Sequence, residues 1–254
     1  MSEYRPVREG REKAESVRYQ HDLGDAPVRD LFGFIEKNFK DLLVVRFPME
    51  AGPDGALLKA NKRWIIVVNT WDQLLVRQRY TASHELGHYL FDREHSAIQI
   101  DRQILRGHSA VEVRANAFAV HFLLPATVLR TRFQSSEIKV DDPQSIVATA
   151  MEYGLSVQSL SWHMLNVLGI SETDRQRIVD IRNPFRIAAR MGLSYRVGQE
   201  MNAKNAKGWP RQYLALASRA FEANHIDEEE FASLIGDEEL FKSLRDAITA
   251  DGAA

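Results

Sequence analysis

The 254-residue chain is expected to fold as an α+β protein, with a few-stranded sheet and helices in its N-terminal half and a mostly helical C-terminal region. Residues 42–47 and 64–69 have the length and the apolar, β-branched content of buried strands. Elsewhere the apolar residues recur every three or four positions, and beyond Pro143 this helical spacing dominates.

Two predicted helices precede the first strand. Residues 8–20 are largely polar and predict an exposed helix. A second helix is expected after Asp25, because Pro27 suits the first turn of a helix. Its apolar residues form a single stripe, at Val28, Leu31, Phe32, Ile35 and Phe39.

Two longer helices follow the strands. Residues 74–91 have helical spacing, and so do residues 109–124, which end at Pro125. The polar segment between them, residues 92–108, is expected to form a loop with a short strand at residues 98–100.

The C-terminal half predicts a helix–turn–helix pattern at residues 145–153 and 157–168. A polar segment marked by Gly and Pro, residues 203–210, is the best linker candidate. Three helices are expected after it, at residues 213–224, 228–235 and 238–248. The chain is thus expected to have three parts, at residues 1–135, 136–202 and 203–254.

Composition narrows the possible functions. The net charge of −2 gives no overall reason to expect binding to nucleic acid or to an anionic membrane. The chain has no cysteine, which excludes disulfides, thiolate metal sites and cysteine nucleophiles. Residues 1–18 lack the apolar run of a signal peptide, and no window reaches the roughly 18–20 apolar residues of a membrane span. A soluble cytoplasmic protein is therefore expected.

The segment from His84 to His88 reads His-Glu-Leu-Gly-His and lies on a predicted helix. Residues four apart share a helix face, so His84 and His88 can direct both imidazoles to one zinc ion. Glu85 is rotated by about 100° from His84, beside the metal rather than on it. There it can serve as the general base that activates a water molecule. The pattern predicts a zinc-dependent peptidase.

Two histidines leave such a site incomplete, because catalytic zinc takes three protein ligands and one water. A histidine six residues after His88 would complete one known pattern, but Glu94 stands there. Glu112, on the following helix, is the candidate for the third ligand. It also closes a Ser-x-x-Glu capping box that begins at Ser109, in which its carboxylate would bond the Ser109 amide. From the residues alone, both roles of Glu112 stay open.

Three further residues are candidates for substrate binding. Asn69 ends the strongest strand, which we expect to form an edge where an extended substrate can pair. His95 and His108 flank the expected cleft, and either can donate a hydrogen bond to an oxyanion. His121 lies nine residues from Glu112, half a turn around the same helix, and is expected to be structural.

Three blocks of sequence together carry a family resemblance. They are Arg-Tyr-Thr-Ala-Ser-His-Glu-Leu-Gly-His at residues 79–88, Glu-Val-Arg-Ala-Asn-Ala-Phe-Ala at residues 112–119, and Leu-Leu-Pro at residues 123–125. In this order they resemble the ImmA/IrrE family of zinc metallopeptidases. The departures are Tyr80, where Phe is usual, and Leu124, where Met is usual.

The resemblance implies that Glu112 is the third zinc ligand and that residues 26–129 have a gluzincin-like fold. It also implies a cytoplasmic endopeptidase that cleaves a helix–turn–helix repressor of the XRE type and so derepresses stress-response or mobile-element genes. The alternative is a non-enzymatic regulator that binds DNA or a partner protein through its helical C-terminal half. Direct DNA binding is not expected, because residues 157–168 contain no Lys or Arg to contact phosphates.

Overall fold

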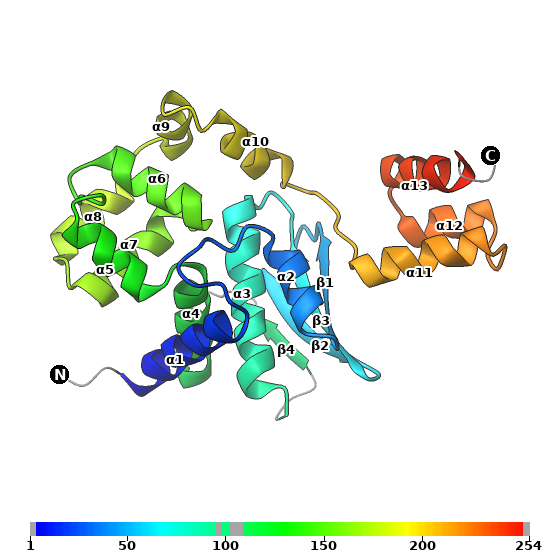
Figure 1. Cartoon of the computed structure of the whole chain (residues 1–254), viewed down its shortest axis with the longest axis horizontal. Coiled ribbons are helices and arrows are strands. Elements are labelled where there is room, and N and C mark those ends of the chain that lie inside the picture. The colour runs from blue at the N-terminus through cyan, green and yellow to red at the C-terminus, as the bar shows by residue number, and fades with distance from the viewer. Residues whose placement is uncertain (1–3, 95–97, 102–108, 251–254) are drawn as a thin grey trace. The chain divides into compact units, whose positions relative to one another are not determined.

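The computed structural model describes residues 4–94, 98–101 and 109–250 (Figure 1). The chain divides into two compact units, Met1–Ala206 and Lys207–Ala254. The expected α+β class is confirmed, since the described strands are confined to the N-terminal half and every described element after residue 101 is a helix. The division into three functional parts stays a prediction.

The first unit contains a four-stranded sheet, with strands β1 (Leu42–Phe47), β2 (Gly55–Ala60), β3 (Arg63–Asn69) and β4 (Ile98–Asp101). Their order is β1-β3-β2-β4, with β1 parallel to β3 and β2 antiparallel to both of its neighbours. Strand β2 was missed by the sequence analysis, because its short run of apolar residues follows a Gly-Pro-Asp-Gly turn signal and contains a lysine.

One face of the sheet belongs to the hydrophobic core. Alternate residues of the three long strands are buried there, at Leu42, Val44, Leu57, Trp64, Ile66 and Val68. Helices α2 (Leu31–Asn38) and α3 (Leu75–Asp92) pack against the strands. Helix α4 (Ala110–Leu123) packs in turn against α3 (Figure 1).

The expectation that the N-terminal helix is exposed is wrong. Helix α1 (Arg5–Gln20) buries Gly10, Ala14 and Val17 and packs along α4. A side chain at Gly10 would collide with the backbone of Arg114 and with the side chain of Ala117. Charged residues surround these positions in the sequence, so the buried stripe does not stand out there.

The remaining helices of the first unit are α5 (Ala126–Gln134), α6 (Pro143–Tyr153), α7 (Val157–Leu168), α8 (Glu172–Val179), α9 (Pro184–Arg190) and α10 (Ser194–Asn202). Helix α7 packs against α5, α6 and α8. The turn between α6 and α7 begins at Gly154, whose φ of +67° suits a left-handed helix cap. Gly154 also lies directly against the side chain of Arg79, where a Cβ atom would not fit.

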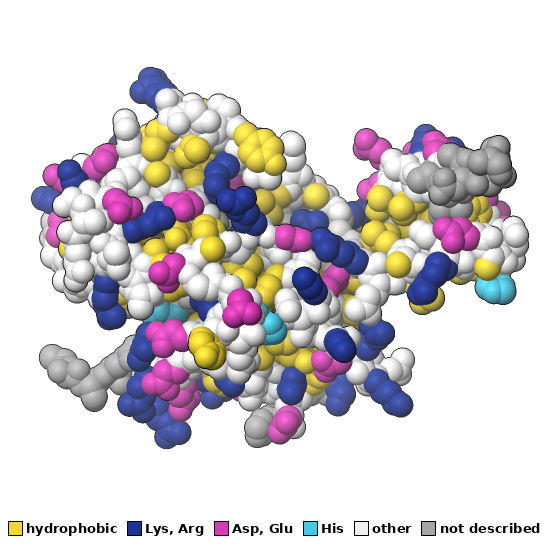
Figure 2. Space-filling view, in the orientation of Figure 1, with side chains coloured by type: hydrophobic (Ala, Val, Ile, Leu, Met, Phe, Trp, Pro, Cys, Tyr) yellow, Lys and Arg dark blue, Asp and Glu magenta, His cyan; other side chains and the backbone are white. Residues whose placement is uncertain are grey.

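The second unit contains α11 (Arg211–Glu222), α12 (Glu228–Ile235) and α13 (Glu238–Ala250). Its small core is formed by Ala217, Phe231, Ile235 and Phe241. Basic and acidic side chains are interspersed on the face of the molecule in Figure 2. No helix in the described part of the chain combines the length and the apolar character that crossing a membrane requires.

Candidate metal centre

Helix α3 carries the two histidines of the His-Glu-Leu-Gly-His segment on one face. The Nε2 atoms of His84 and His88 lie 3.0 Å apart, and both side chains are buried. Gly87, between them, faces α4, and a Cβ atom there would lie 3.2 Å from the Cα atom of Ala115. This close approach of the two helices brings the first turn of α4 to the histidines.

Glu112 is the residue that α4 contributes. Its Oε2 atom lies 3.2 Å from Nε2 of His84, and its Oε1 atom lies 3.3 Å from Nε2 of His88. The Ser109 hydroxyl oxygen accepts a hydrogen bond from the Glu112 backbone amide at 3.2 Å. Ser109 therefore caps α4 through the backbone of Glu112, while the carboxylate faces the two imidazoles instead of turning back to Ser109.

The three side chains fit a metal ion. One donor atom from each of His84, His88 and Glu112 lies within 4.8 Å of the other two. Ligand atoms at about 2.0 Å from a tetrahedral ion are about 3.3 Å apart, close to the separations of 3.0–3.3 Å here. Two imidazole nitrogens and a carboxylate oxygen are a donor set that zinc accepts, and other divalent transition metals also accept it.

A hydrogen bond at Nδ1 fixes the orientation of each imidazole ring. Nδ1 of His84 lies 3.0 Å from Oδ1 of Asn116, and this oxygen also accepts a hydrogen bond from the Tyr80 hydroxyl at 3.0 Å. Nδ1 of His88 lies 3.1 Å from Oδ2 of Asp92. Donation from each Nδ1 fixes the tautomer that leaves Nε2 with a lone pair for the metal.

Sequence reasoning assigned no role to Asp92 or Asn116, although a signal was present. Asp92 lies four residues after His88, and Asn116 lies four residues after Glu112, so each shares a helix face with a candidate ligand. Arg114 contacts the second carboxylate oxygen of Asp92 and stacks over the ring of Phe91 at 4.4 Å. Asp92 is thereby fixed between His88 and a cation.

When no metal is bound, the carboxylates of Asp92 and Glu112 attract the histidine rings electrostatically. Burial lowers the pKa of His88, but hydrogen bonds to Asp92 and Glu112 outweigh it and raise that pKa to about 9. Burial raises the pKa of Glu112, but hydrogen bonds from His84 and His88 outweigh it and hold that pKa well below its usual range. A metal ion that binds here must displace a proton, as is usual for histidine ligands.

Glu85 is completely buried beside this cluster. It does not belong to the three-residue group, and its carboxylate lies against the start of β2. A Cβ atom at Gly55 would lie 2.9 Å from Oε1 of Glu85 and would also collide with the methyl group of Thr81. Gly55 therefore provides the space in which the Glu85 carboxylate sits.

The expectation that Asn69 ends an edge strand is wrong, because β3 lies between β1 and β2. The side-chain oxygen of Asn69 accepts hydrogen bonds from the amides of Met49 and Trp71, and its nitrogen donates to the Met49 carbonyl. These three bonds stabilise the turns that follow β1 and β3. The substrate-binding role of Asn69 stays a prediction. The other two candidates, His95 and His108, lie outside the described residues.

Comparison with known proteins places this site in a family. Residues 40–166, half of the chain, match the peptidase family described as the IrrE N-terminal-like domain. The match spans the whole described sheet and both helices that carry His84, His88 and Glu112. No curated protein matches the chain. The resemblance to the ImmA/IrrE family is confirmed, and the chain belongs to the peptidase family of the IrrE N-terminal-like domain.

Proposed function

We propose that this protein is a zinc-dependent endopeptidase. His84, His88 and Glu112 hold the metal, and Glu85 is the general base. The observation that carries the proposal is the convergence of three donor atoms from α3 and α4, with a buried carboxylate next to them on α3. Membership of a peptidase family supports the reaction class.

A metal ion held by His84, His88 and Glu112 would supply Lewis acidity, which would lower the pKa of a water molecule and polarise the peptide carbonyl. Glu85 accepts the proton of the attacking water and delivers it to the nitrogen of the leaving amine. His84 and His88 keep their ring orientation throughout, because Asn116 and Asp92 hold their Nδ1 atoms.

The peptide substrate is proposed to bind as an extended strand. Among the described strands, β4 lies at the edge of the sheet next to β2, and β2 begins at Gly55, beside Glu85. A peptide that pairs with this edge through its backbone would pass near the general base. The edge at β4 thus replaces the edge that the sequence analysis expected at β3.

The proposed substrate is a helix–turn–helix repressor of the XRE type, and its cleavage in the cytoplasm would derepress stress-response or mobile-element genes. This part rests on the family resemblance. Helix α7 contains no Lys or Arg, so it is proposed to pack or to dock protein rather than to bind DNA directly.

The decisive experiment incubates the zinc-loaded protein with a purified repressor of the XRE type and maps the products by mass spectrometry. One zinc-dependent cut is expected, and Glu85→Gln should abolish it while retaining bound zinc. Glu112→Gln should lower zinc occupancy. A Glu85→Gln protein that keeps every biological activity would instead support the non-enzymatic regulator.

A further inference from the structure

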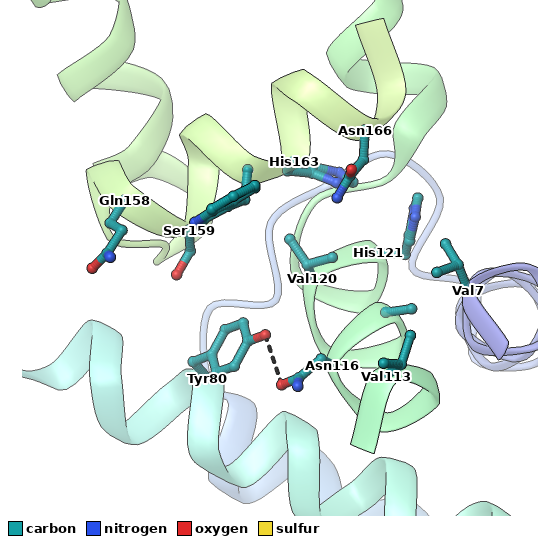
Figure 3. Close-up of a pocket in the computed structure, with 12 residues that line it drawn as sticks. Val7, Tyr80, Val113, Asn116, Val120, His121, Gln158, Ser159, His163 and Asn166 are labelled. Atoms are coloured by element: carbon teal, nitrogen blue, oxygen red, sulfur yellow. Dashed lines mark hydrogen bonds between the residues drawn. The ribbon is translucent and has the colours of Figure 1, made fainter. Parts of the chain in front are cut away.

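The two candidate histidine ligands are supported by different parts of the chain. Asn116 of α4 holds the ring of His84, and the Tyr80 hydroxyl of α3 bonds Asn116 in turn (Figure 3). The ring of His88 is held by Asp92, four residues further along the same helix. The orientation of His88 therefore depends on whatever keeps Asp92 in place.

Asp92 has a second carboxylate oxygen, which faces α4. The Asp92 side chain is 11% exposed, and its Oδ1 atom contacts Nη2 of Arg114. One oxygen thus bonds the histidine and the other bonds the guanidinium. A carboxylate buried this deeply is costly to leave unpaired, because it has lost most of its hydration. Without Arg114, we expect Asp92 to turn toward solvent and away from Nδ1 of His88.

The guanidinium of Arg114 is itself held on two further sides. It lies over the ring of Phe91, 4.4 Å from the ring centroid. Its Nη1 atom lies 3.6 Å from Oε2 of Glu9 on α1. A planar guanidinium can face two carboxylates with its edge while its plane stacks on an aromatic ring, which an ammonium group cannot do. Arg114 therefore joins α1, α3 and α4 at one point.

Helix α1 packs against α4 at this same residue. A Cβ atom at Gly10 would collide with the backbone oxygen of Arg114. Figure 3 shows Val7, three residues earlier on α1, near Val113 of α4. This close packing leaves α1 little room to slide, so it fixes the position of Glu9 relative to Arg114.

We propose that Arg114 is a positioning residue of the metal centre and that Glu9 holds it in place. Arg114 acts through Asp92, which keeps the ring of His88 in the orientation that the metal needs. Helix α1 lies outside the residues that match the peptidase family, and it thereby becomes part of the metal centre. The inference rests on the proposed zinc site and assigns no step of the reaction to Arg114.

The direction of the effect on zinc affinity separates positioning from charge alone. Arg114 is a cation close to a site that binds a cation, so its charge opposes metal binding. If charge alone mattered, removing it would strengthen zinc binding. Loss of the support for Asp92 acts in the opposite direction, because a histidine without its supporting partner binds metal more weakly. A weaker affinity for zinc is therefore the sign of positioning.

The test titrates the metal-free, full-length protein with zinc against a chromophoric chelator. Arg114→Gln should weaken zinc binding by about three- to tenfold, less than the roughly 10–100-fold typical of a partner that contacts the ligand directly. Arg114→Lys keeps a charge next to Asp92 but loses the planar fork. It should recover the affinity to within about threefold of the wild type.

Lys13→Gln is the matched control for the loss of charge. Lys13 is a second cation over the Phe91 ring, at 5.7 Å, and it is not among the described partners of Asp92. Its replacement should leave zinc affinity within about twofold of the wild type, because a solvated charge at a distance is screened.

The contribution of α1 has its own pair of variants. Glu9→Lys places a cation against Arg114 and should weaken zinc binding about threefold. Glu12→Lys makes the same change of charge where the carboxylate lies 4.0 Å from Arg8 and Arg11, and should leave the affinity within about twofold. In an Arg114→Gln background the two variants should have equal effects, because Glu9 acts only through Arg114.

Bound Co²⁺ provides a spectroscopic readout of ligand geometry. Its visible absorption should change in Arg114→Gln but not in Lys13→Gln, whereas a loss of stability alone leaves the spectrum of the folded protein unchanged. Circular dichroism establishes that each variant is folded. If Arg114→Gln does not fold, the comparison of Glu9→Lys with Glu12→Lys decides the proposal.

Unchanged or tighter zinc binding by folded Arg114→Gln would overturn the proposal. Equal losses in Glu9→Lys and Glu12→Lys would overturn the part assigned to α1. A wild-type protein that binds no zinc would instead refute the proposed metal centre and the proposed function together. If the wild type binds zinc and cleaves its substrate while Arg114→Gln keeps full zinc affinity, only the present inference fails.

Discussion

Replacing Asn116 with alanine should weaken zinc binding although all three proposed ligands remain. Oδ1 of Asn116 lies 3.0 Å from Nδ1 of His84 and is positioned to accept its proton. Without that acceptor, the ring of His84 loses both its fixed tautomer and its orientation. Loss of such a supporting partner typically costs 10–100-fold in metal affinity, or about 1.4–2.7 kcal/mol.

Tyr80→Phe is the matched control for this variant. It removes the hydroxyl that donates to the same Asn116 oxygen, but it leaves the bond between Asn116 and His84 in place. It also introduces the residue that is usual in the family at this position. Zinc affinity should therefore fall by no more than about fivefold, since a single neutral hydrogen bond contributes about 1 kcal/mol.

Both variants are assayed by titrating the metal-free protein with zinc against a chromophoric chelator of known affinity. Circular dichroism and thermal unfolding establish that each variant is folded. The reasoning is refuted if folded Asn116→Ala binds zinc within twofold of the wild type. It is equally refuted if Tyr80→Phe loses as much affinity as Asn116→Ala, because the effect would then not come from the support of His84.

Three other substitutions test the packing around Glu85, the protonation of His163 and the capping of α3. Gly55→Ala should lower the peptidase rate at least tenfold with unchanged zinc content, because its methyl group would press on the Glu85 carboxylate; rates and metal analysis check this. Burial lowers the pKa of His163 to about 4 from an ordinary value near 6.5, so the unfolded chain binds this proton first as the pH falls. His163 alone should therefore contribute a loss of stability of about 3 kcal/mol between pH 7 and pH 4, and denaturant unfolding should show a shallower pH dependence for His163→Gln. Glu200→Ala should lower the free energy of unfolding by about 1–2 kcal/mol, because the Glu200 carboxylate accepts a hydrogen bond from an amide in the first turn of α3 at 2.9 Å. Urea unfolding measures this change, and a value below about 0.3 kcal/mol would contradict the capping role.

The sequence could predict those parts of the structure that depend on spacing within one element. His84 and His88 share a face because four residues make about one helical turn, whatever surrounds the helix. Strands β1 and β3 were predicted to within a residue, because their apolar, β-branched runs are continuous. The spacing also predicts a position for Glu85 beside the histidine pair rather than in it, and the structure has this arrangement.

Features that depend on contacts between distant segments could not be predicted in this way. The residues of β3 do not indicate which strands lie beside it in the sheet. Because β1 and β2 flank it, the prediction that Asn69 ends an edge strand was wrong. The cap of α3 comes from Glu200, more than a hundred residues away, while the N-terminal residue of the helix offers no side-chain cap. Ser109 and Glu112 illustrate a further limit, since the sequence pattern of a capping box does not reveal which way the carboxylate turns.

Helix α4 contributes two residues to the metal centre. Successive turns of this one helix carry Glu112 toward the histidines and Asn116 to Nδ1 of His84. The helix has little freedom to slide, because it is pressed against Gly87 on one side and Gly10 on another, with no room for a Cβ atom at Gly10. A shift of α4 that would carry Glu112 away from the two histidines is therefore costly. The packing of α4 against α1 and α3 thus fixes both a candidate ligand and the residue that orients another.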